Sequence, residues 1–244
     1  MKQLLKIILA KLGYRLQGTR YYPRQLLESQ LLRPLEFEDV ICRRMFNFGQ
    51  KLTFIQVGVF DGVTGDPLRK YIEACRWQGV LVEPQSHAVS QLRKLYHGNE
   101  SIVVMNVALD CTRGKRTLFT VESDRAPAWA GGLASFDRAT IMKHSDLIPG
   151  LEQMIREETV ECVPFDDVLK RLPSGQLDLL QIDTEGADAK ILSLFPFDRI
   201  KPAIIHWEVK HLSMAQREEC LGRLVAHGYR FASSGDENMM ALVF

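Results

Sequence analysis

Residues 54–62 read Phe-Ile-Gln-Val-Gly-Val-Phe-Asp-Gly, and this stretch decides the fold. A short apolar run with β-branched residues ends at Gly58 and Gly62, which predicts a buried parallel strand running into a tight turn. Glycine reaches positive φ and leaves no side chain between the backbone and a ligand. A second apolar run ends at Glu83, 25 residues after Gly58. Strand, glycine turn, helix, strand and acid together indicate a nucleoside-binding half-domain, with the acid placed to accept hydrogen bonds from ribose hydroxyls.

The spacing of the two glycines narrows the choice of ligand. Dinucleotide sites use Gly-x-Gly-x-x-Gly because pyrophosphate must come close to a helix N-terminus. Here the spacing is Gly58-x-x-x-Gly62, with the bulky Val59 and Phe60 between, and no phosphate-loop Lys-Ser/Thr follows. A nucleoside without phosphates fits this turn better. S-adenosylmethionine is such a ligand, since the turn can hold its amino-acid end and Glu83 its ribose. Glycine at such a turn also has a purely steric explanation.

Downstream of residue 51, apolar strands alternate with amphipathic helices, which predicts a parallel sheet covered by helices on both faces. Only Gly235–Asn238 separates the last two strands, and so short a link joins antiparallel neighbours. We therefore predict an α/β protein with the class I methyltransferase (Rossmann-like) fold: a mainly parallel seven-stranded sheet with an antiparallel C-terminal hairpin. The expected strands are 53–57, 79–82, 102–108, 117–121, 177–182, 203–209, 230–233 and 239–244, and the expected helices are 67–76, 86–96, 164–171, 187–195 and 214–227.

Two segments stand outside this alternation. Residues 1–50 are predicted to form a helical N-terminal extension, and residues 51–244 an S-adenosylmethionine-dependent methyltransferase domain. The first twelve residues are amphipathic, and their apolar run Ile7–Ala10 is too short for a transmembrane helix. We expect this helix to pack on the domain, with peripheral membrane contact as the alternative. Residues 122–160 show no clear strand, and they are either a lid or acceptor-recognition segment or a purely structural excursion.

Composition excludes several classes of protein. A chain of 244 residues, 46% apolar and 25% charged, suits one globular α/β domain with an extension. The net charge of +1 gives no reason to expect a nucleic-acid partner. The five cysteines are scattered and contain no CxxC pair, so there is neither a zinc signature nor a disulfide framework. We expect a cytoplasmic protein, with the inner face of the membrane as a further possibility.

Acidic side chains follow two later strands. The first of these strands delivers Asp183 and Glu185 to its carboxyl end, and the next delivers Glu208 and His211. In open α/β sheets the ligand crevice lies beyond the carboxyl ends of the strands. Groups placed there can orient a cationic cofactor, bind a metal or take a proton. The alternative is structural: Asp183 caps a loop, Glu185 favours a helix N-terminus, and His211 is a solvated loop residue.

Five short motifs occur in this order along the chain: Phe54–Gly62 continued by Val63–Pro67, then Val82–Pro84, Asn106–Leu109, Ile182–Ala187 and Trp207–Leu212. Combined, and over about residues 53–242, they resemble the FkbM-type S-adenosylmethionine-dependent methyltransferases. The resemblance implies O-methylation, often of sugar hydroxyls in glycans or of natural-product intermediates. It implies a cofactor site formed by Gln56, Gly58, Asp61, Gly62, Glu83, Pro84, Asn106, Ala108 and Asp183, and an acceptor side formed by Asp183, Glu185, Glu208 and His211. Gln56 departs from the family pattern, because many members carry an acid at this position.

The predicted reaction transfers a methyl group to an acceptor hydroxyl. His211 or Asp183 is the candidate general base, and Glu185 and Glu208 position the hydroxyl. A bound Mg²⁺ on Asp183, Glu185 and Glu208 is the alternative way to activate the hydroxyl. Two other functions stay open, namely a nicotinamide-dependent oxidoreductase and an inactive nucleoside-binding module. The expected partner is a small-molecule or glycan acceptor, and the sequence leaves the oligomeric state undetermined.

Overall fold

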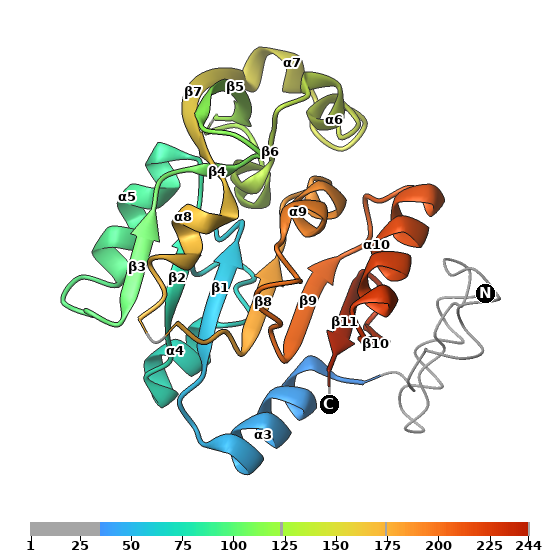
Figure 1. Cartoon of the computed structure of the whole chain (residues 1–244). Helices are drawn as coiled ribbons and strands as arrows, with labels where there is room; N and C mark the ends of the chain where they lie inside the picture. Colours follow the sequence, from blue (N-terminus) through green and yellow to red (C-terminus); the bar gives the residue numbers. More distant parts are fainter. Residues whose placement is uncertain (1–34, 123, 174, 244) are drawn as a thin grey trace, which may run out of the picture.

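The computed structural model describes residues 35–122, 124–173 and 175–243, and its centre is a seven-stranded sheet (Figure 1). The strands are β1 (Thr53–Val57), β2 (Gln78–Val82), β3 (Ile102–Met105), β8 (Leu179–Ile182), β9 (Ile204–Glu208), β10 (Arg230–Ser234) and β11 (Asn238–Leu242). Their order across the sheet is β10-β11-β9-β8-β1-β2-β3. Only β11 runs antiparallel to its two neighbours, β9 and β10. The predicted class I methyltransferase fold and its antiparallel C-terminal hairpin are therefore confirmed.

Helices cover both faces of this sheet, as predicted. They are α3 (Phe37–Phe48), α4 (Arg69–Cys75), α5 (Ser86–Leu95), α8 (Phe165–Leu169), α9 (Asp188–Leu194) and α10 (Met214–Ala226). Every residue of β1 is buried, and successive side chains point to opposite faces. Phe54 packs in the core beneath α3, α4 and α5, whereas Ile55 and Val57 pack in the core beneath α8, α9 and α10. A strand buried on both faces has a continuous apolar sequence, which is why β1 was recognisable.

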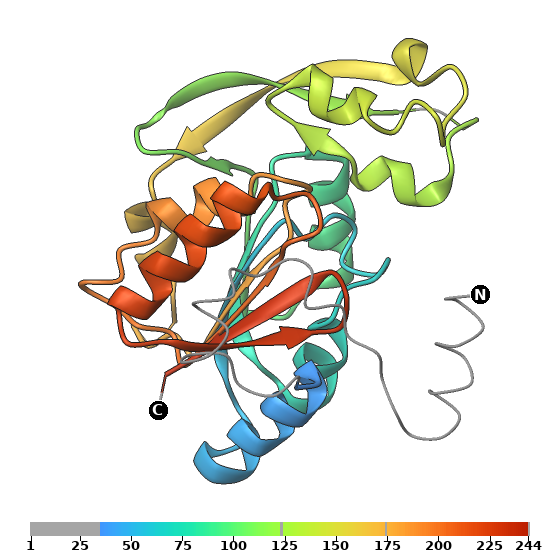
Figure 2. The ribbon, with the colours of Figure 1, turned by 90° about the vertical axis from the view of Figure 1, so that its right-hand side faces the viewer.

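A second, four-stranded sheet lies above the carboxyl ends of the central strands, at the top of Figures 1 and 2. It has the order β4-β7-β5-β6, with strands β4 (Ala108–Leu109), β5 (Gly114–Val121), β6 (Ala134–Ser135) and β7 (Ile155–Val163). The 3-10 helix η1 (Ala128–Gly132) and the helices α6 (Arg138–Met142) and α7 (Leu151–Met154) belong to the same part of the chain. We call residues 108–163 the cap.

The cap corrects three expectations from the sequence. The strand expected at 102–108 ends at Met105, and the chain then passes into the cap. The strand expected at 117–121 is part of β5, which pairs with β7 in the cap sheet. Residues 122–160, which show no clear strand in the sequence, contain β6 and most of β7. Strand β7 was missed because its first half faces solvent and is charged, so its apolar side chains are few. Pairing with β5 stabilises it instead.

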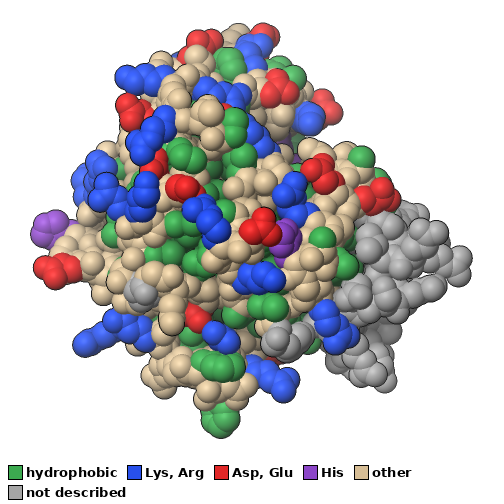
Figure 3. All heavy atoms as spheres, in the orientation of Figure 1, with side chains coloured by type: hydrophobic (Ala, Val, Ile, Leu, Met, Phe, Trp, Pro, Cys, Tyr) green, Lys and Arg blue, Asp and Glu red, His purple; other side chains and the backbone are tan. Residues whose placement is uncertain are grey.

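Helix α3 lies within the predicted N-terminal extension and packs on the central sheet. Its Phe37 and Ile41 are buried in one core cluster with Phe54. The guanidinium of Arg44 also forms an ion pair of 2.8 Å with Asp178, next to β8. The predicted amphipathic helix of residues 1–12 lies outside the described residues. Among the helices that are described, none is long and apolar enough to cross a membrane. On the face shown in Figure 3, basic and acidic side chains are interspersed.

Candidate active site

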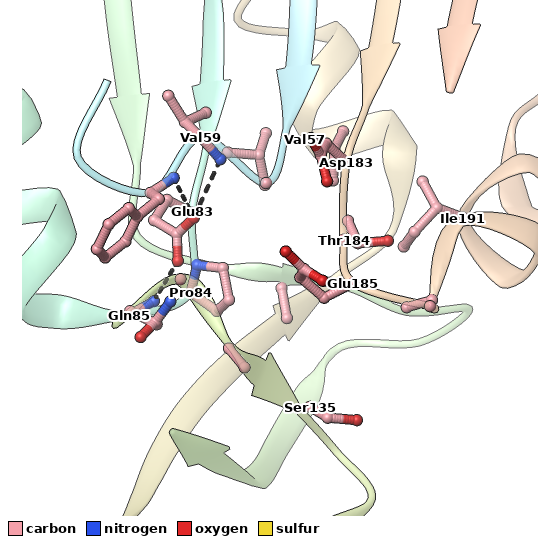
Figure 4. A pocket seen from close by; sticks show the side chains of 18 of the residues that line it. Val57, Val59, Glu83, Pro84, Gln85, Ser135, Asp183, Thr184, Glu185 and Ile191 are labelled. Atoms are coloured by element: carbon pink, nitrogen blue, oxygen red, sulfur yellow. Dashed lines mark hydrogen bonds between the residues drawn. The ribbon is translucent and has the colours of Figure 1, made fainter. Parts of the chain in front are cut away.

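The glycine turn after β1 is held in place by Glu83, at the end of β2. One carboxylate oxygen of Glu83 accepts hydrogen bonds from the backbone N–H groups of Val59 (3.1 Å) and Phe60 (2.9 Å), and the other accepts from Gln85 (3.0 Å) (Figure 4). Glu83 is 3% exposed. Burial raises the pKa of Glu83, and the three backbone N–H groups oppose that rise. A carboxylate offers about four acceptor positions, so one remains for a ligand.

The two glycines of the turn have different roles. Gly58 has φ of 78°, and a Cβ atom placed on it would lie 1.7 Å from the carbonyl oxygen of Asp183. The turn after β1 therefore touches the end of β8 backbone to backbone, which only glycine allows. A Cβ on Gly62 would lie 2.7 Å from the side chain of Leu92 in α5. Glycine at position 62 therefore leaves room for the packing of α5, which agrees with the steric explanation.

A cavity of about 500 Å³ opens between the carboxyl ends of β1, β2 and β8 and the underside of the cap. Figure 4 shows Glu83 at one side of it and Asp183 and Glu185 at the other, with Ser135 of the cap facing them. The sheet and the cap thus each supply one wall. This position matches the ligand crevice expected for an open α/β sheet.

The predicted cofactor residues divide into two groups. Those that line the cavity are Gln56, Gly58, Glu83, Pro84, Ala108 and Asp183. Three others support the walls from outside, namely Asp61, Gly62 and Asn106. The Asp61 carboxylate accepts backbone hydrogen bonds from Val63 and Thr64 and so closes a local turn. The Asn106 amide donates to the carbonyl oxygens of Glu83 and Pro84. Direct contact of these three residues with a cofactor stays a prediction.

The four predicted acceptor-side residues come together from β8 and β9. The Nε2 atom of His211 lies 3.2 Å from a carboxylate oxygen of Glu185 and 3.8 Å from one of Glu208. Asp183 and Glu185 line the cavity, whereas Glu208 and His211 lie behind them. Glu185 does not begin the following helix. Helix α9 begins at Asp188, beyond Glu185, and the Asp188 carboxylate accepts the hydrogen bonds from the turn.

The pKa values of three side chains in this group are raised. Burial first, and then the charges of Asp188 and Glu185, raise the pKa of Asp183 to about 7. Burial, together with Asp183 and Glu185, raises the pKa of Glu208 to about 8. The hydrogen bond to Glu185 raises the pKa of His211. A side chain with a pKa near 7 can both take up and release a proton near neutral pH.

The backbone at Glu185 is strained. Its φ of 52° lies in the left-handed region, which is uncommon for residues other than glycine. The next residue, Gly186, has φ of 107°. These two conformations turn the Glu185 carboxylate toward His211 and the cavity. Strain of this kind is typical of functional sites.

The cap and one acid with no predicted role also line the cavity. Trp129, Asp137 and Thr140 line the cavity from the cap, and the His144 ring centroid lies 5.8 Å from that of His211. Asp66, which follows the glycine turn, also lines the cavity. Asp66 occurs in the first motif of the family resemblance, where no role was assigned to it. The pattern of residues 122–160 left both a lid and a structural excursion open, and it does not show which of these residues reach the cavity.

The strand order and the antiparallel C-terminal hairpin are those of the class I methyltransferase fold. The sequence profile described as "Methyltransferase FkbM domain" matches residues 56–231, so the chain belongs to the FkbM methyltransferase family. No curated protein sequence matches the chain.

Three solved structures show a distant likeness in fold. One is a methyltransferase FkbM from Methylobacillus flagellatus KT, with 11% identity and a TM-score of 0.45, covering 79% of this chain and 44% of that chain. A precorrin-6y C5,15-methyltransferase from Geobacter metallireducens has 10% identity and a TM-score of 0.41, with 93% of each chain covered. A fibrillarin pre-rRNA processing protein from Methanococcus jannaschii has 9% identity and a TM-score of 0.40, with 80% and 67% covered. Likenesses this distant say nothing about the substrate.

Proposed function

We propose that the protein is an S-adenosylmethionine-dependent O-methyltransferase that acts on a hydroxyl of a sugar, a glycan or a natural-product intermediate. The observation that carries the proposal is the cavity under the cap, with Glu83 at one side and the Asp183–Glu185 pair at the other. Such a cavity has room for a nucleoside cofactor. Its ionisable groups lie where an acceptor hydroxyl would bind. Membership of the FkbM family supports methyl transfer, and the acceptor class comes from the family resemblance.

The residues that would hold the cofactor fit its chemistry. Glu83 keeps one acceptor position for a ribose hydroxyl, and the glycine turn presents backbone without side chains beside it. Bound S-adenosylmethionine would supply a methyl group already activated by the positive sulfur. What the protein must add is alignment of the acceptor, which contributes up to about 7–11 kcal/mol in favourable cases.

Asp183 is the general base in this proposal. It lines the cavity, and its backbone touches the glycine turn, so it lies where cofactor and acceptor would meet. A base works best with a pKa near the working pH, and burial and neighbouring acids raise the pKa of Asp183 to about 7. Glu185 would hold the acceptor hydroxyl. His211 and Glu208, which lie behind the cavity wall, would position Glu185.

Metal assistance is a second candidate, because Glu185, Glu208 and His211 offer ligand atoms that all lie within 4.8 Å of one another. Asp183, which the sequence prediction included with the two glutamates, is not in this group. A set with an imidazole suits Mn²⁺ or Zn²⁺ better than Mg²⁺, which prefers oxygen ligands. Full activity after exhaustive chelation would rule out the metal route. Activity that is lost on chelation and restored by Mn²⁺ would support it.

Calorimetric titration with S-adenosylmethionine, S-adenosylhomocysteine and NAD tests the class of ligand. We expect binding of both S-adenosyl compounds and none of NAD, since the pyrophosphate-binding glycine pattern is absent. Binding of NAD alone would favour the oxidoreductase alternative, which family membership already opposes. Binding without turnover on any hydroxylated acceptor would favour an inactive module.

The acceptor is tested with labelled S-adenosylmethionine and a panel of sugars, glycans and hydroxylated small molecules. Asp183→Asn, which keeps the shape of the side chain, is the matched control for enzymatic transfer. We expect transfer to at least one hydroxyl by the wild type. A small-molecule or glycan partner, the absence of nucleic acid as partner, and a cytoplasmic location stay proposals beside it.

A further inference from the structure

Two buried acceptor atoms on the wall of the cavity near β1 have no donor in the part of the chain that the structure describes. They are Oε1 of Gln56 and Oδ2 of Asp66. Gln56 is 2% exposed, and its Nε2 atom donates to Oδ1 of Asp66 at 3.2 Å. The backbone N–H of Leu68 donates to that same oxygen at 2.8 Å. Oδ2 of Asp66 and the single side-chain oxygen of Gln56 therefore have no hydrogen bond within the described residues, although both residues line the cavity.

Among residues 35–122, 124–173 and 175–243, no Lys or Arg side chain forms an ion pair with Asp66. Of the basic residues that line the cavity, Arg116 and Lys190 both pair with Asp110, at 2.8 and 3.0 Å. Arg69, close in sequence, pairs with Glu73 at 2.9 Å. Burial raises the pKa of Asp66, and the hydrogen bonds from Leu68 and Gln56 and the nearby charge of Arg69 oppose that rise only in part.

The Tyr96 hydroxyl is the other buried group near Asp66. It has no hydrogen-bond partner among the described residues, and burial first, then the charge of Asp66, raises the pKa of Tyr96. No hydrogen bond joins Tyr96 to Asp66, and Tyr96 does not line the cavity. The cavity, which Gln56 and Asp66 both line, is the other place from which a donor can reach their two oxygens.

The chemistry of these oxygens specifies the donor. Both are acceptors, and one belongs to an acid, so the group that fits them carries positive charge and at least two N–H bonds. A primary ammonium meets both conditions. A ligand carboxylate would be repelled, and a sulfonium has no N–H to donate. Gln56 lies two residues before Gly58, so the ammonium would lie beside the glycine turn, away from the Glu83 carboxylate that is expected to bind ribose.

We propose that Asp66 and Gln56 together bind the amino group of the amino-acid part of S-adenosylmethionine, with Asp66 supplying the negative charge. This inference rests on the proposed function. It also accounts for Gln56, the position at which many relatives carry an acid: here the charge comes from Asp66, ten residues further along the chain, and the Gln56 amide connects it to the end of β1.

The test compares two ligands that differ by the amino-acid part. S-adenosylhomocysteine carries the amino group, whereas 5′-methylthioadenosine keeps the nucleoside and lacks it. We expect Asp66→Asn to bind S-adenosylhomocysteine about 10- to 100-fold more weakly than the wild type, the effect of losing one charge-assisted hydrogen bond. Its affinity for 5′-methylthioadenosine should be unchanged. Glu100→Gln removes an exposed carboxylate that does not line the cavity, and it should change neither affinity.

The outcomes separate this inference from the proposed function. If the wild type binds neither ligand, the proposed function fails and the inference fails with it. If the wild type binds S-adenosylhomocysteine and Asp66→Asn binds it equally well, the inference is wrong while the function stands. Equal weakening of both ligands would also overturn it, because that result indicates a general effect on the turn.

A second variant covers the case in which Asp66→Asn does not fold. Gln56→Met keeps the length of the side chain and removes the acceptor oxygen. We expect about 3- to 10-fold weaker binding of S-adenosylhomocysteine and unchanged binding of 5′-methylthioadenosine, as for a single neutral hydrogen bond. Unchanged affinity for both ligands would contradict the inference.

Discussion

Replacing Glu83 by Gln should destabilise the protein even when no ligand is present. The carboxylate of Glu83 accepts three backbone N–H groups, two from the turn after β1 and one from the start of α5. An amide has one acceptor oxygen, so its NH₂ group must face at least one N–H that now has no acceptor. The substitution therefore acts on the turn itself and not only on a ribose contact.

The size of this effect follows from the number of bonds lost. A hydrogen bond to a charged group contributes about 1.5–3 kcal/mol. The neutral amide also removes the burial cost that raises the pKa of Glu83, which offsets part of the loss. We expect a net decrease in the free energy of unfolding of about 2 kcal/mol. For a domain of this size, that lowers the unfolding temperature by about 4–8 °C.

Thermal unfolding followed by circular dichroism, without ligand, measures the effect. Glu158→Gln is the matched control, because its carboxylate accepts one backbone N–H, from Ser86, at the surface. The control should stay within about 1 kcal/mol of the wild type. If Glu83→Gln unfolds at the wild-type temperature and loses only affinity for S-adenosylhomocysteine, the carboxylate does not hold the turn and the reasoning is refuted.

Three further predictions concern the end of β8 and the acids around it. Asp183→Asn should lower kcat by about 10²- to 10⁴-fold and abolish the rise in rate through pH 7, since the base must be ionised and its pKa is about 7. A variant that keeps this pH profile would contradict the assignment of Asp183 as the base. Gly58→Ala should lower the free energy of unfolding by at least about 3 kcal/mol in chemical denaturation, because its Cβ would meet the Asp183 carbonyl. The control Gly65→Ala has open space around it and should lower the free energy of unfolding by about 1–2 kcal/mol. Similar losses for both would show that the close approach is unimportant. The pKa of Glu208 is raised in the folded protein to about 8. The free energy of unfolding should therefore fall as pH rises from about 4.5 to 8. Glu208→Gln should flatten that fall when unfolding is measured with EDTA present. Parallel stability curves for the variant and the wild type would mean that Glu208 has no such shift.

The central sheet was predictable because its strands are buried on both faces. Strands β1, β8 and β9 are short apolar runs that end in glycine or acid, and burial on two sides requires that composition. The antiparallel hairpin followed from the short link before the last strand, which in the structure is residues 235–237. The cap sheet was not predictable in the same way. In β7, charged residues such as Glu157 and Glu161 face solvent, and pairing with β5 is a contact between distant parts of the chain.

The candidate site was predictable to the extent that residues follow strands. Asp183, Glu185, Glu208 and His211 come together because neighbouring parallel strands end at one edge of a sheet. Which of them reach the cavity could not be read from the spacing. That depends on the left-handed turn at Glu185 and on the wall supplied by the cap.

The sequence by itself determined the class of this protein, the edge of the sheet that carries the site, and Glu83, Asp183 and Glu185 as part of its wall. These conclusions rest on local features: apolar runs, glycine at turns and acids after strands. Only the tertiary structure decided that Glu83 also holds the turn, that Gln56 meets Asp66, and that the cap closes the cavity. Each of these depends on side chains and segments far apart in the chain that meet only after folding, and no local pattern records such contacts.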